Sequence, residues 1–263
     1  MRTAFIGGGV MGSAMLRGAL SAGVLKAGDI VVAEILAKRR TELESEFKVA
    51  TTESVADAMS GATTIIAALK PQDLGRAATR AAGEPLVISI MAGVTIKTLV
   101  QSFGSPKVVR VMPNTPAAIG AGMSAWTATE GVSGTDREFV GALLGSLGEH
   151  LYVADESKVD MATAVNGSGP GFIFLLMEAM VDAAVSVGLT RAQAEPLVRQ
   201  TFFGSAAYAK ENAATLAELR AQVTSPAGTT AAGLFELERH GVRAAMMEAV
   251  EAAYVRAREL GSS

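Results

Sequence analysis

Cysteine is absent from the 263-residue chain, and histidine occurs only twice, at His150 and His240. The lack of cysteine excludes disulfides, thiolate catalysis and cysteine-ligated metals, and two isolated histidines supply no motif such as H-E-x-x-H. Charge is also scarce, because only 19% of residues are charged and the net charge is −3. The cysteine and histidine content therefore predicts no metal site. The net charge gives no reason to expect nucleic acid or an anionic membrane as a partner.

Long uninterrupted hydrophobic runs are lacking as well. The most apolar stretch, residues 172–187, is broken by Glu178 and Asp182, which argues against a membrane span. The first residues lack the basic, hydrophobic and small-residue succession of a signal peptide, so we expect a cytoplasmic protein. Hydrophobic residues make up 49% of the chain and aromatic ones 5%, which predicts a sizeable, mainly aliphatic core.

Short apolar runs alternate with helix-like runs in the first half of the chain. The predicted strands are Thr3–Ile6, Ile30–Ala33, Thr64–Leu69, Leu86–Met91, Lys107–Met112, Met123–Thr127 and His150–Val153. The predicted helices are Met11–Ser21, Leu36–Phe47, Gln72–Ala82, Thr95–Phe103 and Asp136–Leu147. This alternation indicates an α/β fold with a Rossmann-like, doubly wound, mostly parallel sheet and helices on both faces.

The pattern changes after about residue 155, where no further strand is predicted. Helices are predicted at Phe172–Val187, Arg191–Lys210, Leu216–Val223 and Val242–Leu260. The first of these is apolar on nearly every side, so it has to be covered all round. We therefore expect two domains, a sheet domain at 1–155 and an all-helical one at 156–263 that needs a second subunit to cover it.

A G-x-G-x-x-G pattern follows the first predicted strand and opens a helix. Gly7 permits a tight turn, Gly9 lets a pyrophosphate approach the backbone, and Gly12 lets the helix pack closely. The helix start offers free N–H groups and the positive end of its dipole. The alternative is a tight turn without a ligand. The residues assigned to a dinucleotide site here are Gly7, Gly8, Gly9, Val10, Met11 and Gly12.

Glu34 stands 22 residues after Gly12, at the end of the second predicted strand. An acid at this place accepts hydrogen bonds from ribose hydroxyls, which favours NAD, and repels the 2′-phosphate of NADP. Lys38, Arg39 and Arg40 follow closely, and they could attract that phosphate or form an ordinary solvated charge run. The sequence therefore predicts NADPH or NADH as cofactor, with a slight lean toward NADH.

Three later strands end in loops on the same edge of the predicted sheet, where open α/β sheets bind ligands. Each loop alone is equally well explained as a plain turn. The prediction of a cofactor site therefore depends on all three loops lying on the same edge. Asn114 could orient a carboxamide or a carboxylate, or it could cap the turn that follows it. The residues assigned to the cofactor from these loops are Leu69, Lys70, Pro71, Met91, Ala92, Gly93 and Asn114.

Two motifs lie in the helical half. In residues 164–172, Ser168 is a plausible helix cap and Pro170 falls in the first turn, so a helix start or kink explains the segment. The segment TSPAGTT, residues 224–230, offers several N–H and O–H donors in a small space. It indicates either a carboxylate-binding loop or a capped helix start.

The motifs GGGVMG, LKP, MAGV, VMPNTPA, GSGPGFIF and TSPAGTT, in this order, resemble those of pyrroline-5-carboxylate reductases from residue 1 to about residue 260. The resemblance implies a Rossmann-like domain and an all-helical domain that dimerises, with dimers often assembling further, commonly into decamers. It implies transfer of hydride from NADPH or NADH to the imine of 1-pyrroline-5-carboxylate, which forms L-proline in the last step of proline biosynthesis. It also implies that Lys70, Pro71, Met91, Ala92 and Asn114 surround the nicotinamide and its ribose.

The resemblance assigns the substrate to the TSPAGTT segment. Backbone N–H groups would hold its carboxylate, and Thr230 would hydrogen-bond the ring nitrogen as the catalytic residue. The substrate-binding residues are Ser225, Ala227, Gly228, Thr229 and Thr230. Imine reduction needs little acid–base machinery, because a protonated C=N accepts hydride readily. The absence of an obvious histidine or carboxylate pair in the motifs fits this reaction better than oxidation of a hydroxy acid.

Three positions depart from the pattern of the family. Ala227 replaces a glycine, which would cost about 1 kcal/mol or more if that position has φ above zero. Gly171-Phe172 replaces Ala-Tyr, and Glu34 replaces a small hydroxyl residue. Other hypotheses are a reductase of a different cyclic imine or of a small β-hydroxy acid, a nicotinamide-binding sensor without turnover, and a structural dimer. The intact SPAGTT and GSGP segments argue against a sensor, because a sensor need not keep a substrate-binding loop. The glycine pattern argues against a structural dimer, which would leave it unexplained.

Overall fold

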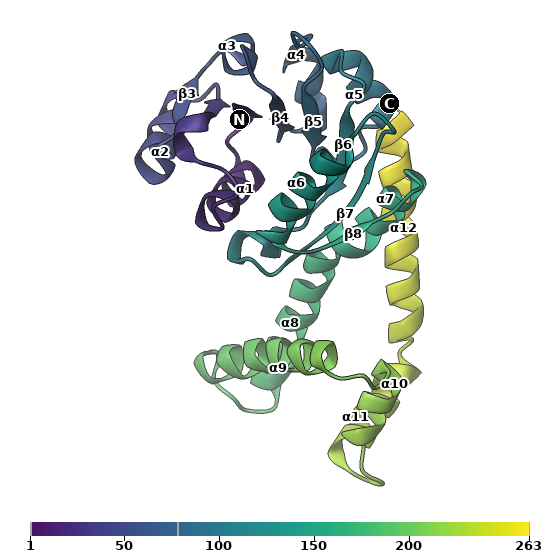
Figure 1. Ribbon diagram of the computed structural model, residues 1–263. Coiled ribbons are helices and arrows are strands. Elements are labelled where there is room, and N and C mark those ends of the chain that lie inside the picture. The colour runs from purple at the N-terminus through teal and green to yellow at the C-terminus, as the bar shows by residue number, and fades with distance from the viewer. Residues whose placement is uncertain (1, 78, 263) are drawn as a thin grey trace. The chain divides into compact units, whose positions relative to one another are not determined.

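The computed structural model describes residues 2–77 and 79–262, which divide into two compact units. We call Met1–Pro170 together with Ala252–Ser263 the sheet unit, and Gly171–Glu251 the helical unit. Most of their helices and strands are labelled in Figure 1.

An eight-stranded sheet forms the centre of the sheet unit (Figure 1). The order is β3-β2-β1-β4-β5-β6-β7-β8, and neighbours are parallel except β6 and β7. The strands are β1 Thr3–Ile6, β2 Ile30–Ala33, β3 Ala50–Thr52, β4 Thr64–Ala67, β5 Leu86–Ser89, β6 Val108–Met112, β7 Gly122–Ala128 and β8 Gly148–Tyr152. The predicted mostly parallel, doubly wound sheet is confirmed, with β3 as an additional edge strand.

Helices cover both faces of this sheet and create two apolar cores. Side chains alternate between the faces along each strand, so Phe5 belongs to one core while Ala4 and Ile6 belong to the other. Helices α1, α2 and α6 contribute to the first core, and α3, α4 and α5 to the second. Because both faces are buried, the central strands are continuous apolar runs. These helices are α1 Val10–Ser21, α2 Ala37–Phe47, α3 Val55–Met59, α4 Leu74–Ala77, α5 Ile96–Phe103 and α6 Gly134–Gly145.

The predicted helix Gln72–Ala82 is wrong in its extent. Pro71–Asp73 form a 3-10 turn, α4 ends at Ala77, residue 78 lies outside the described residues, and residues 79–82 are not helical. Pro71 stands at the first position of the turn, where its missing N–H costs nothing, whereas Gly75 weakens the helix interior and favours a short element.

The sheet unit runs past the expected boundary near residue 155. Arg110 of β6 is 2% exposed and pairs with Glu156 at 2.9 Å and Asp160 at 2.5 Å. Glu156 also accepts the N–H of Ile96 at 2.8 Å. These contacts hold α7, Ser157–Ala162, against the sheet, so the compact unit extends to Pro170. A division of domains between residues 155 and 156 stays a prediction.

The remaining chain is helical, as predicted, although the helix at Thr229–Arg239 was not among the predicted ones. The helices are α8 Gly169–Ser186, α9 Arg191–Glu211, α10 Leu216–Gln222, α11 Thr229–Arg239 and α12 Val242–Ser262, and no strand follows β8 in the described residues. Thr190 and Thr215 form capping boxes at the starts of α9 and α10, which satisfy N–H groups that the helices leave free.

The helical unit has a small core and much exposed apolar surface. Leu175, Phe203 and Phe235 are 64%, 69% and 66% exposed, whereas the buried cluster consists of Val181, Ala194 and Val198. Exposed apolar surface of this kind is typical of a unit that another subunit completes.

Candidate active site

The glycine loop between β1 and α1 has the shape of a dinucleotide site. Gly7 has a φ of +99°, and a Cβ there would lie 2.6 Å from the carbonyl oxygen of Ala68. A Cβ on Gly12 would lie 2.5 Å from the carbonyl oxygen of Gly7. Gly9 is exposed instead, and a Cβ on it would meet nothing within 4 Å. Packing therefore requires Gly7 and Gly12, whereas Gly9 leaves open space beside the backbone, which fits a pyrophosphate.

The N-terminus of α1 is open behind this loop. Gly9 is the N-cap, no side chain caps the helix, and its first turn holds no acidic residue. The first N–H groups of a helix have no acceptor within it, and Val10 is 80% exposed. The loop also lies at the switch point between β1 and β4, where the strand order reverses. Helix starts at such points bind phosphate groups in doubly wound folds.

Glu34 lies beside the glycine loop, at the end of β2. Its Oε2 atom accepts a hydrogen bond from the N–H of Gly8 at 3.1 Å, and its Oε1 atom accepts one from the N–H of Leu36 at 3.0 Å. The structure thus brings Glu34 and the loop together, as the sequence predicted.

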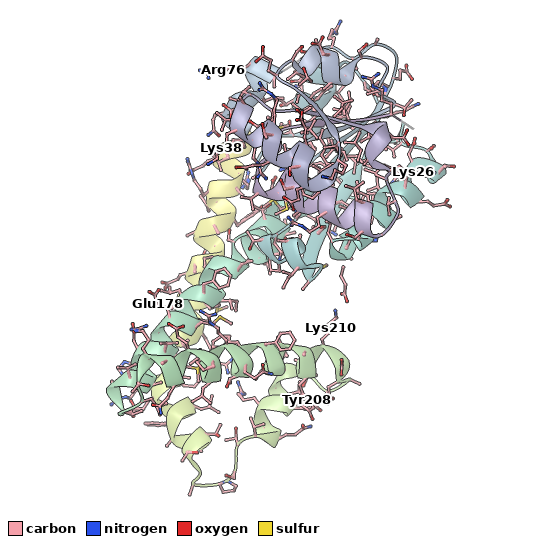
Figure 2. The ribbon with its side chains drawn as sticks, turned by 90° about the vertical axis from the view of Figure 1, so that its left-hand side faces the viewer. Lys26, Lys38, Arg76, Glu178, Tyr208 and Lys210 are labelled. Carbon is pink, nitrogen blue, oxygen red and sulfur yellow. The ribbon has the colours of Figure 1, made fainter. Side chains whose placement is uncertain are left out.

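The basic residues after Glu34 differ in what they contact. Arg39 donates to the carbonyl oxygen of Gly8 at 2.9 Å, and Arg40 donates to that of Glu34 at 2.8 Å. Lys38 is exposed, and Figure 2 shows its side chain pointing outward. The two arginines therefore brace the backbone of the site, an outcome that a run of charges in a sequence does not reveal.

The loops after β4 and β5 lie on the same edge of the sheet. Leu69 comes within 3.1 Å of the position that a Cβ on Gly7 would take, and the exposed Lys70 precedes the turn that Pro71 opens. Met91 is 1% exposed, and its N–H donates to the Ser89 side chain. These loops stand where the prediction placed them.

Gly93, in the loop after β5, is explained by packing. Its φ is +74°, and a Cβ there would lie 2.8 Å from Cβ of Leu260 in α12. The neighbouring Ala92 is half-buried. The close approach of α12 accounts for the glycine, and contacts of Ala92 and Gly93 with a cofactor stay predictions.

Asn114 and Asn166 organise the edge beyond β6. Asn114 does not cap the turn that follows it; its Oδ1 atom accepts the N–H of Met123 at 2.9 Å. Asn166 donates through Nδ2 to the carbonyl oxygens of Met112 at 3.0 Å and Met123 at 2.9 Å. Its Oδ1 atom is buried and has no hydrogen-bond partner in the described part of the chain. Asn166 lies in a π-helical turn, a feature frequent at functional sites, and the sequence assigned it no role.

The loop before α11 is a tight turn in the helical unit. The N–H of Gly228 donates to the carbonyl oxygen of Ser225 at 3.0 Å, with Pro226 and Ala227 between them. Ala227 has a φ of +57°, so the turn follows the type II pattern. A Cβ on Gly228 would lie 2.3 Å from the Ser225 hydroxyl and 3.1 Å from the Ser225 carbonyl oxygen, so a larger residue here would have to displace the serine side chain.

Helix α11 begins immediately after this turn. Gly228 is its N-cap, no side chain caps it, and its first turn holds no acidic residue. Thr229 and Thr230 are both exposed. The helix start therefore presents N–H and hydroxyl donors to solvent, an arrangement suited to a carboxylate.

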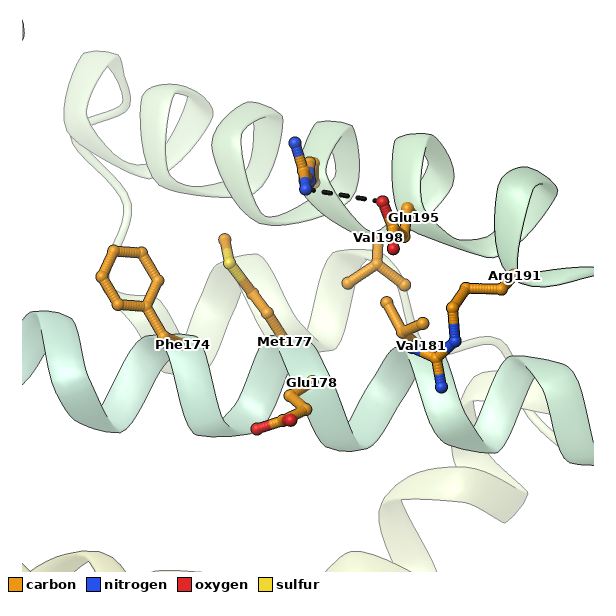
Figure 3. A pocket seen from close by; sticks show the side chains of 8 residues that line it. Phe174, Met177, Glu178, Val181, Arg191, Glu195 and Val198 are labelled. Carbon is orange, nitrogen blue, oxygen red and sulfur yellow. Dashed lines mark hydrogen bonds and ion pairs between the residues drawn. The ribbon is translucent and has the colours of Figure 1, made fainter.

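A hollow of about 640 Å³ lies between α8 and α9 in the helical unit (Figure 3). Apolar side chains, including Phe174, Met177 and Val198, point into it, while Glu195 and Arg199 pair at its rim. None of the residues that line it was predicted to bind cofactor or substrate. The hollow lies next to the small buried cluster of the helical unit, since Val181 and Val198 belong to both.

Comparison with known proteins matches both halves of the chain. A family model described as "NADP oxidoreductase coenzyme F420-dependent" matches residues 2–93, and one described as "Pyrroline-5-carboxylate reductase dimerisation" matches residues 156–260. The pyrroline-5-carboxylate reductase of Synechocystis is 38% identical over 264 residues, covering 99% of this chain and 98% of the relative. The chain belongs to the pyrroline-5-carboxylate reductase family.

Other relatives of this reductase agree. The pyrroline-5-carboxylate reductase of Mycobacterium tuberculosis is 41% identical and covers 98% of this chain and 96% of the relative. The structure of the Coxiella burnetii enzyme has a TM-score of 0.91 and 31% identity, with 100% and 99% of the two chains covered. The Plasmodium falciparum enzyme, solved with NADP bound, has a TM-score of 0.87 and 30% identity, with 99% and 98% covered. The motif resemblance is confirmed, as is the fold of a Rossmann-like NADP-binding domain followed by a helical dimerisation region.

The long apolar helix of this reductase is accounted for by the same comparison. Residues Ser157–Ser186 are long and apolar enough to cross a membrane by length and composition alone. They lie within the region that matches the dimerisation family. The helix is the dimerisation helix of a soluble biosynthetic enzyme that forms homo-oligomers.

Proposed function

We propose that this reductase takes its hydride from NADPH or NADH held at the carboxyl edge of its sheet, and that the loop before α11 binds the substrate. As a member of its family it is an NAD(P)-dependent oxidoreductase that converts pyrroline-5-carboxylate to proline. The observation that carries the proposal for the cofactor is the open N-terminus of α1 behind Gly9, at the switch point of the sheet.

The sheet unit supplies the residues for the cofactor. Backbone N–H groups at Gly9, Val10 and Met11 would hold the pyrophosphate, and Glu34 would accept hydrogen bonds from the adenosine ribose. The other half of the cofactor would contact residues of the three later loops, namely Leu69, Lys70, Pro71, Met91, Ala92, Gly93 and Asn114. When bound, the reduced nicotinamide supplies the hydride that the imine carbon accepts.

The helical unit supplies the residues for the substrate. N–H groups at the start of α11 would hold the carboxylate of pyrroline-5-carboxylate, with the turn from Ser225 to Gly228 fixing their direction. The Thr230 hydroxyl would hydrogen-bond the ring nitrogen and orient the C=N bond. The nitrogen carries a proton in the reactive iminium form, so hydride addition to carbon yields proline directly and requires no further proton transfer.

The assembly and location complete the proposal. The exposed apolar faces of α8 and α9 are covered in a homodimer, and dimers assemble further, with a decamer as one such form. The enzyme works in the cytoplasm, where it meets both its substrate and reduced nicotinamide cofactors.

The test is to mix the purified protein with pyrroline-5-carboxylate and follow the absorbance of NADH and NADPH in parallel, with proline quantified at the end. Stoichiometric formation of proline with oxidation of either cofactor is the expected result. Cofactor binding without oxidation would favour a sensor. Oxidation with a different cyclic imine, but none with pyrroline-5-carboxylate, would mean that the substrate is wrong.

A further inference from the structure

We infer that Glu34 makes NADH the preferred cofactor of this reductase. The inference rests on the proposed function, because it assumes that the dinucleotide binds along the glycine loop. It concerns the adenosine ribose, where NADH carries a 2′-hydroxyl and NADPH a 2′-phosphate.

The Glu34 carboxylate is fixed in place and keeps acceptor capacity. Two N–H groups hold it, one from Gly8 at 3.1 Å and one from Leu36 at 3.0 Å, and the side chain is half-buried. A carboxylate has about four acceptor positions, so positions remain for ribose hydroxyls. A hydroxyl can donate to them, whereas the 2′-phosphate of NADPH brings negative charge against the carboxylate.

The carboxylate also occupies the place at which α2 would attract a phosphate. Helix α2 begins at Ala37, with Leu36 as its N-cap. Helix N-termini favour anions through free N–H groups and the helix dipole. Here the N–H of Leu36 already donates to Glu34, so the anion at this helix start is the protein's own carboxylate.

The nearby arginines already have acceptors within the protein. Arg39 donates to the carbonyl oxygen of Gly8 and to the Ser13 hydroxyl, and it pairs with Glu42 at 2.8 Å. Turning this guanidinium toward a phosphate would weaken the contacts to Gly8 and Ser13 that hold the glycine loop.

Arg40 is engaged in a similar way. Its guanidinium donates to the carbonyl oxygens of Glu34 at 2.8 Å and Ile35 at 3.0 Å, and it lies 3.8 Å from the Glu53 carboxylate. Lys38 is exposed, and an exposed ammonium is screened by solvent and holds an anion weakly. The charges and hydrogen bonds around Glu34 therefore favour NADH, whose adenosine ribose carries no phosphate.

The test measures dissociation constants of NADH and NADPH by calorimetry, together with kcat/KM for each cofactor at saturating pyrroline-5-carboxylate. NADH is expected to bind more tightly by about tenfold or more, the range of one hydrogen bond to a charged group. Glu34→Gln is expected to lower this ratio by about tenfold, because it removes the negative charge and keeps the shape. The control Glu46→Gln removes an exposed acid elsewhere on α2, one that pairs with Arg17, and should leave the ratio unchanged.

The outcomes separate this inference from the proposed function. Equal or tighter binding of NADPH by the unaltered protein, with proline still formed, overturns the role of Glu34 and leaves the enzyme activity intact. Failure to bind or oxidise either cofactor overturns the proposed function itself. If Glu34→Gln does not fold, the binding ratio of the unaltered protein decides the question.

Discussion

Replacing Ala227 by glycine should stabilise this reductase. Ala227 is a non-glycine residue with positive φ, at +57°, in the turn that precedes α11. A side chain in the left-handed region costs about 1–2 kcal/mol, because Cβ approaches the following carbonyl oxygen. Glycine removes this strain but gains about 0.5–1 kcal/mol of freedom in the unfolded chain. The net expectation is a gain of about 0.5–1 kcal/mol.

The assay is thermal unfolding followed by calorimetry at fixed protein concentration. For a chain of this size the expected gain corresponds to a rise in Tm of roughly 2 °C. The control is Ala206→Gly at an exposed position inside α9, where glycine should lower stability by about 1 kcal/mol. The KM for pyrroline-5-carboxylate should stay within about twofold for Ala227→Gly, because the turn already has the conformation that glycine favours. An unchanged or lower Tm for Ala227→Gly would refute the reasoning about strain at this turn.

Three further changes test other parts of the structure. Thr230→Ala should lower kcat/KM by about a hundredfold, the scale of one well-placed polar group. The control Thr201→Ala removes an exposed hydroxyl of α9 and should leave kcat/KM unchanged. A decrease in kcat/KM below twofold for Thr230→Ala would contradict the assignment of Thr230 as the catalytic residue. Arg110→Leu should lower the free energy of unfolding in urea by about 3 kcal/mol, because it leaves two acidic partners without their cation. An unaltered urea midpoint would show that these ion pairs do not contribute to stability. Hydrogen bonds from Thr215 hold the pKa of Glu218 below its ordinary range, so this carboxylate adds stability above that range and loses it in acid. Glu218→Ala should therefore lower Tm at pH 7, and the difference from the unaltered protein should vanish as the pH falls through the lowered pKa.

The sequence predicted the central strands well because their physical signal is simple. Thr3–Ile6 and Ile30–Ala33 agree with β1 and β2 to the residue, since each is a short apolar run bounded by polar or glycine residues. Strand β3, Ala50–Thr52, was missed because it is a three-residue edge strand with no apolar run. Helix α7 was missed because its position depends on Arg110, whose partners lie 46 and 50 residues away.

The candidate site likewise contains features that the sequence predicted and features that it could not predict. Glycine spacing and loop position predicted the neighbourhood of Gly9 and Glu34, because both follow from strand ends on one sheet edge. The hydrogen bonds of Arg39, Arg40 and Asn166 to backbone carbonyls could not be predicted. They depend on the exact path of segments distant in sequence, and a side chain that will bond a carbonyl looks like any other polar residue.

The close packing of Gly93 against Leu260 has a consequence for the order in which the chain folds during its synthesis. The sheet unit consists of two separate stretches of chain, Met1–Pro170 and Ala252–Ser263, with the helical unit inserted between them. The loop that carries Gly93 therefore stays without its cover until residues 252–263 have been synthesised. Domains usually fold in order of synthesis, but here the first stretch of the sheet unit is completed only after the helical unit has been synthesised. Removal of residues 252–263 should consequently disturb the maturation of the cofactor-binding half, although the whole helical unit separates them from it in the sequence.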